Sequence, residues 1–246
     1  MKNRDWLAAT TYPGRGIVVG LSADGTTAIQ VFWTMGRSSK SRNRLLVADA
    51  DHVVRTQLAA PDPAVGDTSL IVYRALARAG EYEIVSNGTH TDLLVTGLIA
   101  GVPFSELCLG LEVEPDPPNF TSRIAGVFDR RARHYALAAA RAPSNDTSQQ
   151  QVQATTYLQL KAGRGHCITT YDGDGDPLPP FTGEPFAVAI GNRPDAVATD
   201  YWSLLDPDNR VSLVVKAVSL ATAATSLHII NRHAAVPSHA ELSSNR

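Results

Sequence analysis

The chain has 246 residues, of which 43% are hydrophobic and 19% are charged. These proportions are typical of a globular protein and exclude a disordered, fibrous or coiled-coil chain. Lysine and arginine together number 22, against 24 aspartates and glutamates. The broad basic field that non-specific nucleic-acid binding requires is therefore missing, and we expect no nucleic-acid partner.

The cysteines and the hydropathy pattern exclude further classes of protein. Cys108 and Cys167 are far apart and neither belongs to a C-x-x-C pair, which excludes a disulfide framework and a four-cysteine zinc site. The sequence has no run of 18 apolar residues and no signal-peptide pattern after Met1. We therefore expect a cytoplasmic protein without a membrane partner.

Strand-like runs outnumber helical patterns along the chain. Residues 16–21 and 27–35 are rich in β-branched and aromatic residues, and Asp24-Gly25 between them predicts the turn of a hairpin. Further strand-like runs follow along the chain, at residues 53–58, 70–76, 82–87, 124–128, 134–140, 153–160 and 166–170.

Helical patterns occur in two blocks. From Asp92, a possible N-cap, leucines recur at helical spacing as far as Leu111, and residues 101–103 divide this run into two short helices. A second block begins at Pro194, since proline favours the first helical position, and ends at Leu205. The chain then returns to strands at residues 211–220 and 227–231, which predict a second hairpin.

This order of elements predicts an α+β fold with antiparallel sheets covered by helices, because alternating β and α units are absent. No internal repeat is present, and no loop-like segment is long enough to divide the chain. We expect one domain over residues 1–235 and a polar C-terminal tail over residues 236–246.

The densest chemical pattern is a basic segment that follows the second predicted strand. Residues 37–44 hold four cations and three serines, and Arg15 adds a cation before the first strand. The planar guanidinium group of arginine and the hydroxyl of serine are typical hydrogen-bond donors to a phosphate or another oxyanion. A solvated basic turn explains the composition equally well.

The segment 86–92 connects a predicted strand to a predicted helix. It could direct backbone amides and short polar side chains at an anion. From the residues alone, an ordinary turn is favoured, in which Asn87-Gly88 supplies a positive φ and Asp92 caps the helix.

The spacing of the residues does not match the motifs of metal sites or of several common enzyme classes. Residues 172–176 alternate aspartate and glycine, but the sixth and twelfth positions counted from Asp172 hold Pro177 and Gly183, where a calcium loop requires glycine and glutamate. The seven histidines show no zinc-site spacing, and the motifs of α/β-hydrolases, P-loops and dinucleotide folds do not occur. We expect no metal and no cofactor.

Five segments in order resemble the IMP cyclohydrolase family of archaeal type. They are residues 12–20, 32–37 with 41–44, 85–92, 119–124 and 169–180. The resemblance implies a four-layer αββα sandwich similar to the N-terminal-nucleophile hydrolases, assembled as a homo-oligomer. It also implies the reaction in which 5-formamidoimidazole-4-carboxamide ribonucleotide (FAICAR) loses water to become inosine monophosphate (IMP).

The resemblance also implies the roles of individual residues toward a purine nucleotide. Catalysis would fall to Arg44, Tyr73 and Glu114, with Glu106 and Glu112 near the last of these in sequence. Substrate binding would involve Arg15, Arg37, Arg42, Asn87, Gly88, His90, Asn119, Thr121 and Arg123.

Two other functions stay open at this point. One is an amide hydrolase on the same sandwich, which would require processing to an internal nucleophile because positions 1 and 2 hold Met and Lys. The other is a nucleotide-binding protein without turnover.

Overall fold

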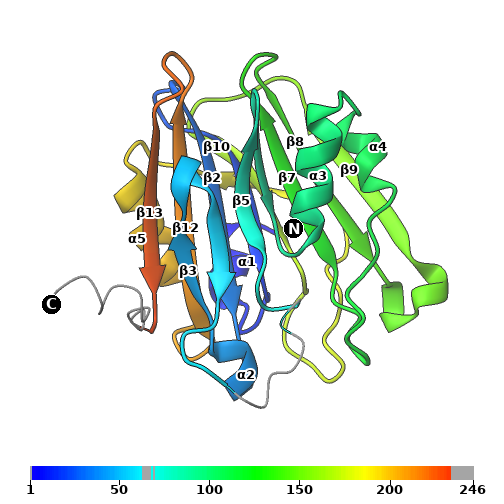
Figure 1. Cartoon of the computed structure of the whole chain (residues 1–246). Coiled ribbons are helices and arrows are strands. Elements are labelled where there is room, and N and C mark those ends of the chain that lie inside the picture. The colour runs from blue at the N-terminus through cyan, green and yellow to red at the C-terminus, as the bar shows by residue number, and fades with distance from the viewer. Residues whose placement is uncertain (1, 63–67, 69, 234–246) are drawn as a thin grey trace, which may run out of the picture.

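Two antiparallel sheets face each other in the computed structural model, which describes residues 2–62, 68 and 70–233. Figure 1 shows that the strand axes of the two sheets are roughly aligned, although neighbouring strands are antiparallel. The six-stranded sheet has the order β11-β10-β1-β2-β12-β13. Its strands are β1 (Gly16–Leu21), β2 (Thr27–Met35), β10 (Arg164–Thr169), β11 (Phe186–Ala189), β12 (Arg210–Ser219) and β13 (Thr225–Asn231).

The second sheet is a seven-stranded meander in which each strand pairs with the next along the chain. Such neighbours need only short connections. The strands are β3 (Leu45–Ala48), β4 (Val54–Gln57), β5 (Arg74–Ala79), β6 (Tyr82–Ser86), β7 (Arg123–Asp129), β8 (His134–Arg141) and β9 (Gln151–Tyr157).

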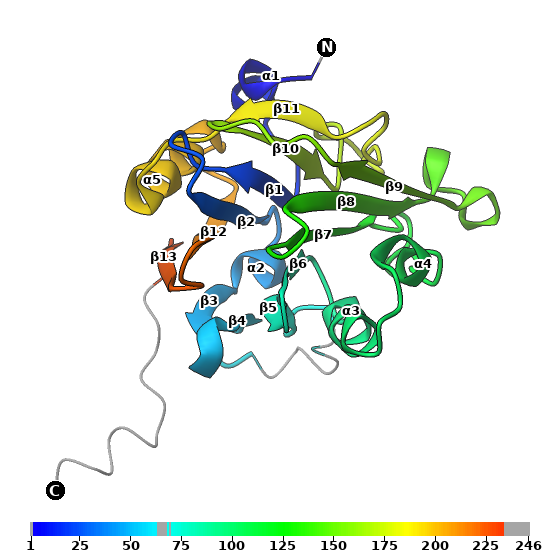
Figure 2. The same ribbon diagram turned by 90° about the horizontal axis from the view of Figure 1, so that it is seen from above.

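Helices cover the outer face of each sheet, as the view in Figure 2 shows. α1 (Arg4–Ala9) and α5 (Pro194–Leu204) pack on the six-stranded sheet, and α3 (His90–Ile99) and α4 (Phe104–Cys108) pack on the seven-stranded sheet. The prediction of an α+β sandwich of antiparallel sheets is confirmed. The remaining helices are the single turn α2 (Ser39–Arg42) and the 3₁₀ turns η1 (Ala50–His52), η2 (Pro143–Asn145) and η3 (Thr147–Gln149).

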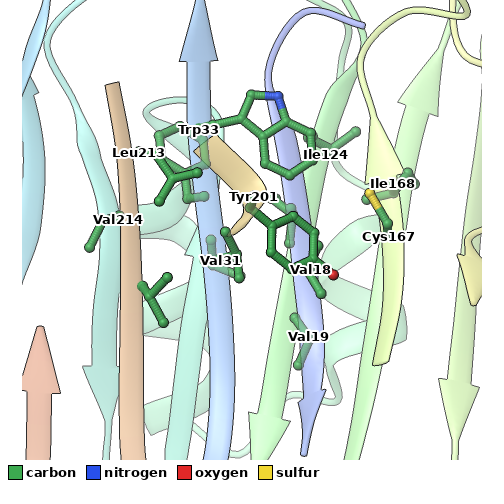
Figure 3. Packing of buried hydrophobic residues seen from close by; sticks show 14 of the residues in the cluster. Val18, Val19, Val31, Trp33, Ile124, Cys167, Ile168, Tyr201, Leu213 and Val214 are labelled. Atoms are coloured by element: carbon green, nitrogen blue, oxygen red, sulfur yellow. The ribbon is translucent and has the colours of Figure 1, made fainter. Parts of the chain in front are cut away.

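The main core lies on both faces of the six-stranded sheet. β1 is buried along its whole length, and one of its faces meets β7 and β8 of the other sheet. On the helix side, Trp33 stacks with Tyr201 of α5 (Figure 3), with ring centroids 6.5 Å apart. Between the sheets, a Cβ on Gly126 would lie 2.9 Å from Val19, so glycine is needed for this close approach.

A buried ion network also joins the sheets. The carboxylate of Glu83 in β6 lies 2.8 Å from Lys216 Nζ in β12, and both residues are fully buried. Arg78 and Arg130 approach the other carboxylate oxygen at 2.7 and 3.0 Å. A buried charge is tolerated only when it is paired in this way.

The first predicted hairpin is confirmed, with Gly25 at a φ of 72° in its turn. From residue 82 onward, the predicted strands begin and end within three residues of β6, β7, β8, β9, β10, β12 and β13. The prediction missed α1 and the four-residue edge strands β3 and β11, which are too short to show a periodic pattern. The predicted tail at residues 236–246 lies outside the described residues.

Two predicted boundaries are wrong. The strand predicted at residues 70–76 begins only at Arg74, because the Thr56 hydroxyl binds the carbonyl of Ile71 and the ladder is shifted by a bulge. The helix predicted from Asp92 begins at His90. Asp92 lies in its first turn and pairs with Arg74 at 2.6 Å, so it is not the cap.

Candidate active site

A pocket of about 570 Å³ opens at one end of the sandwich. Its walls come from the chain just before β1, β5 and β7 and just after β2 and β10, so both sheets contribute. The lining residues are Tyr12, Gly14, Arg15, Met35, Arg37, Ser38, Lys40, Ser41, Arg44, Leu70, Ile71, Glu114, Asp116, Asn119, Thr121, Tyr171 and Leu178. This volume is in the range of small-molecule sites.

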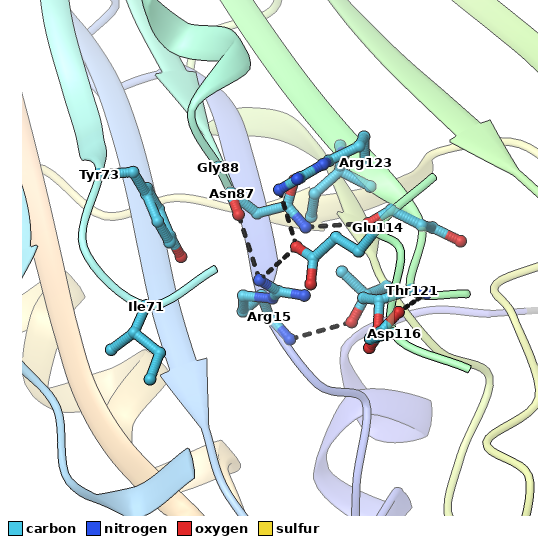
Figure 4. A network of polar contacts seen from close by, with 12 residues as sticks. Arg15, Ile71, Tyr73, Asn87, Gly88, Glu114, Asp116, Thr121 and Arg123 are labelled. Carbon is cyan, nitrogen blue, oxygen red and sulfur yellow. Dashed lines mark hydrogen bonds and ion pairs between the residues drawn. The ribbon is translucent and has the colours of Figure 1, made fainter. Parts of the chain in front are cut away.

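Glu114 is the centre of a buried ionic cluster in this pocket. Its Oε1 atom accepts from Arg15 Nη1 at 2.7 Å and from Arg123 Nη1 at 2.8 Å (Figure 4). Glu114, Arg15 and Arg123 are only 3%, 7% and 9% exposed. Two cations on one carboxylate leave a net positive charge, which favours an anionic group or developing negative charge.

The environment of each arginine determines its proton affinity. Burial lowers the pKa of Arg15, but the adjacent Glu114 carboxylate more than compensates and holds that pKa well above its ordinary value. For Arg123, burial outweighs the attraction of Glu114, and its pKa is lowered. Both guanidinium groups stay charged at neutral pH, because the ordinary pKa of arginine lies far above it.

Two further donors lie close to this cluster and have no acceptor in the part of the chain that the structure describes. Arg44 Nε donates to the Ser41 carbonyl at 3.1 Å, but its buried Nη1 has no partner among the described residues. The buried hydroxyl of Tyr73 also has none. Figure 4 shows Tyr73 on the side opposite Glu114. A buried donor without an acceptor costs about 1–3 kcal/mol, which a bound ligand could recover.

The outer part of the pocket is formed by the basic segment. Arg37 donates to Asp174 at 2.5 Å and to the Gly175 carbonyl at 2.8 Å, and it lies 5.1 Å above the ring of Tyr12. Lys40 and two serines of α2 and its cap complete this rim. Arg42 is not among the lining residues, and it donates instead to the Gly36 carbonyl at 2.9 Å.

Four more predicted binding residues are not among those that line the pocket: Asn87, Gly88, His90 and Arg123. The side chain of Asn87 joins two backbone groups, as it donates to the Ser122 carbonyl and accepts from the Ile124 amide. Neither Asn87 nor Gly88 has a positive φ, so the turn favoured from the sequence is wrong. Gly88 is needed for space, because a Cβ there would lie 1.9 Å from Arg123 Nη1.

The buried ring of His90 makes the stability of the fold depend on pH. Its Nε2 lies 3.2 Å from the Ile124 carbonyl, which assigns the proton to that nitrogen. Burial and then the charge of Arg123 lower the pKa of His90 from 6.5 to about 3. The unfolded chain therefore binds more protons below pH 6.5, and the stability that the neutral ring contributes is lost as the pH falls from there toward 3.

We expect the wild-type free energy of unfolding to fall by about 1–2 kcal/mol more between pH 7 and pH 5 than that of His90→Gln. Glutamine can still donate to the Ile124 carbonyl but does not titrate. Urea unfolding at the two pH values measures the difference, and His52→Gln, at an exposed position, serves as the control. Equal losses in wild type and His90→Gln would contradict the assignment.

Of the predicted binding residues, Asn119 and Thr121 also line the pocket. Asn119 accepts from the Leu178 amide at 2.9 Å and so holds the loop after β10. Three other polar residues line the pocket but have no role implied by the family resemblance: Tyr12, Asp116 and Tyr171. Tyr171 lies in one of the five recognised segments, while Asp116 lies among prolines where the local pattern is uninformative.

Within the described ranges, no group of three or more His, Cys, Asp or Glu side chains could hold a metal ion. In the same part of the chain, no helix is both long and apolar enough to cross a membrane.

Comparison with known proteins gives one finding. A family model described as IMP cyclohydrolase-like protein matches residues 12–222. This range contains every residue that lines the pocket. No curated protein matches the chain.

Proposed function

Since this chain belongs to the IMP cyclohydrolase-like family, which implies a small-molecule nucleotide substrate, we propose that it converts FAICAR to IMP with loss of water. The observation that carries the proposal is the buried Glu114 cluster, which lies in the same pocket as the unpaired donor of Arg44 and near the unpaired hydroxyl of Tyr73. The pocket therefore combines a carboxylate with an arginine donor that has no acceptor among the described residues, and a tyrosine hydroxyl in the same condition lies nearby.

The reaction needs groups of these kinds. The carboxamide nitrogen adds to the formyl carbon, so that a C–N bond forms and negative charge develops on the formyl oxygen. That oxygen then leaves as water, with one proton from the carboxamide nitrogen and one from the formamido nitrogen. The nitrogen is a poor nucleophile, so the step requires orientation, proton removal and stabilisation of the oxygen.

We assign these tasks to the residues that the family resemblance names. Both arginine contacts of Glu114 end on Oε1, so we assign Oε2 to the carboxamide N–H as acceptor and base. Arg44 Nη1 and the Tyr73 hydroxyl donate to the formyl oxygen as charge develops there. Tyr73, Arg15 and Arg44 are close enough to influence one another electrostatically, which supports a shared site.

The nucleotide phosphate is assigned to the rim formed by Arg37, Ser38, Lys40 and Ser41. Arg37 presents a planar fork at the pocket surface. We expect Arg37→Ala to raise KM about tenfold or more with little change in kcat, because a phosphate contact is equally strong in the ground and transition states.

Steady-state kinetics on FAICAR measures this effect. Arg193→Ala is a matched control, since Arg193 also pairs with an aspartate on an exposed surface but lies outside the pocket. A fall in kcat with an unchanged KM in Arg37→Ala would contradict the assignment.

The proposed function is tested by an ultraviolet assay of ring closure with the purified full chain and FAICAR. Conversion to IMP supports the proposal. Binding of IMP without conversion would instead identify a nucleotide-binding protein. The homo-oligomer implied by the resemblance stays a prediction.

A further inference from the structure

Three polar side chains form a continuous hydrogen-bonded chain on one wall of the pocket. The Thr121 hydroxyl lies 2.5 Å from Asp116 Oδ2 and is also hydrogen-bonded to the hydroxyl of Tyr171. The Thr121 amide donates to Asp116 Oδ1 at 2.7 Å. Thr121 and Tyr171 are only 1% and 5% exposed, yet all three residues line the pocket.

The direction of these hydrogen bonds follows from counting protons. Asp116 accepts from Thr121 through both of its oxygens, an arrangement that favours the carboxylate form against the burial that raises its pKa. Thr121 then donates its single hydroxyl proton to Asp116. Burial raises the pKa of Tyr171, so its phenol keeps its proton and must donate it to Thr121. The Tyr171 oxygen is left with lone pairs only, and it therefore acts as an acceptor in the pocket.

This acceptor lies in a pocket that also holds the cationic donors of Arg15, Arg37, Lys40 and Arg44. The residues that contact the three-residue chain show where in the pocket the acceptor lies. Arg37 stacks over Tyr12, and Tyr12 stacks on Tyr171 with ring centroids 6.0 Å apart. At the other end, Asp116 is two residues from Glu114 and influenced by its charge. The chain of three residues thus lies between the proposed phosphate contact and the proposed site of ring closure.

In a nucleotide, the group between the phosphate and the base is the sugar, whose hydroxyls are donors. We propose that Tyr171, oriented by Thr121 and Asp116, accepts a hydrogen bond from a ribose hydroxyl and makes the site selective for ribonucleotides over deoxyribonucleotides. This inference rests on the proposed function for the placement of the nucleotide. Tyr171 touches the substrate, whereas Thr121 and Asp116 are positioning residues.

The test is calorimetric titration of the full chain with IMP, 2′-deoxy-IMP and 3′-deoxy-IMP. We expect wild type to bind IMP about tenfold more tightly than at least one of the deoxy analogues, the scale of one net hydrogen bond. In Tyr171→Phe, the ratio of the affinities for IMP and that analogue is expected to fall to about one. Thr121→Val frees the Tyr171 proton to turn into the pocket, so the ratio is expected to fall there as well.

Tyr12→Phe is the matched control. Tyr12 lines the same pocket and phenylalanine keeps its stacked ring, but its hydroxyl donates to the Met35 carbonyl. Its ratio is expected to stay at the wild-type value. Equal binding of all three nucleotides to wild type, or an unchanged ratio in Tyr171→Phe, overturns the inference while IMP binding and FAICAR turnover persist. Absence of any IMP binding overturns the proposed function, and the inference with it.

Discussion

Glu114→Gln is expected to lower kcat for FAICAR by about 10²- to 10⁴-fold, the range for loss of a positioned acid or base. Glutamine has nearly the same shape, but its amide cannot take a proton from the carboxamide nitrogen. It also leaves Arg15 and Arg123 without the carboxylate that both now contact. Steady-state kinetics at saturating FAICAR measures the loss.

The control separates catalysis from the general effect of removing a charge. Glu106 is exposed on α4 and outside the pocket, so Glu106→Gln is expected to keep wild-type turnover. Because a buried ion pair is disturbed in Glu114→Gln, its thermal unfolding is measured beside its kinetics. A folded Glu114→Gln enzyme that retains near-normal turnover would show that the role carried over from the family is wrong for this residue.

Tyr73→Phe is expected to lower kcat by about 10²-fold or more, the scale on which removal of one oxyanion donor acts. The change keeps the ring, which is buried just before β5, and removes only the hydroxyl. Since that hydroxyl has no protein partner among the described residues, the stability of the fold is expected to change little. The test measures kcat and the midpoint of thermal unfolding for Tyr73→Phe and for wild type.

Tyr201→Phe gives the opposite pattern and is the matched control. Tyr201 is fully buried in α5, it is not among the residues that line the pocket, and its hydroxyl donates to the Ala189 carbonyl at 3.0 Å. Its loss is expected to reduce stability by about 1 kcal/mol and leave kcat unchanged. If Tyr73→Phe instead lost stability and kept its turnover, the tyrosine would be an ordinary core residue.

Much of the architecture was determined by local sequence pattern. Runs of β-branched and aromatic residues and the turn at Asp24-Gly25 predicted most of the strands and both hairpins, because such residues favour strands and Asp-Gly favours a tight turn. The two helical blocks followed from leucine spacing and from Pro194. The short edge strands β3 and β11 could not be predicted, since four residues carry too little periodicity.

The site was only partly accessible from the sequence. The family resemblance selected Arg15, Arg37, Arg44 and Glu114, all of which line one pocket. It also selected Asn87 and Arg42, whose hydrogen-bonding groups bind other parts of the protein. A sequence motif indicates that a residue type is required at a position. It does not show whether that residue contacts a ligand or holds another residue of the protein in place.

Which side chains come into contact depends on the tertiary structure. Arg15 before β1 and Arg123 at the start of β7 belong to different sheets, yet both bind one oxygen of Glu114. The same is true of Tyr171, which reaches Thr121 across 50 positions of sequence. Such contacts depend on how two sheets stack and on the space left by glycines such as Gly88. Stacking is set by the packing of the whole core, which no local pattern along the chain specifies.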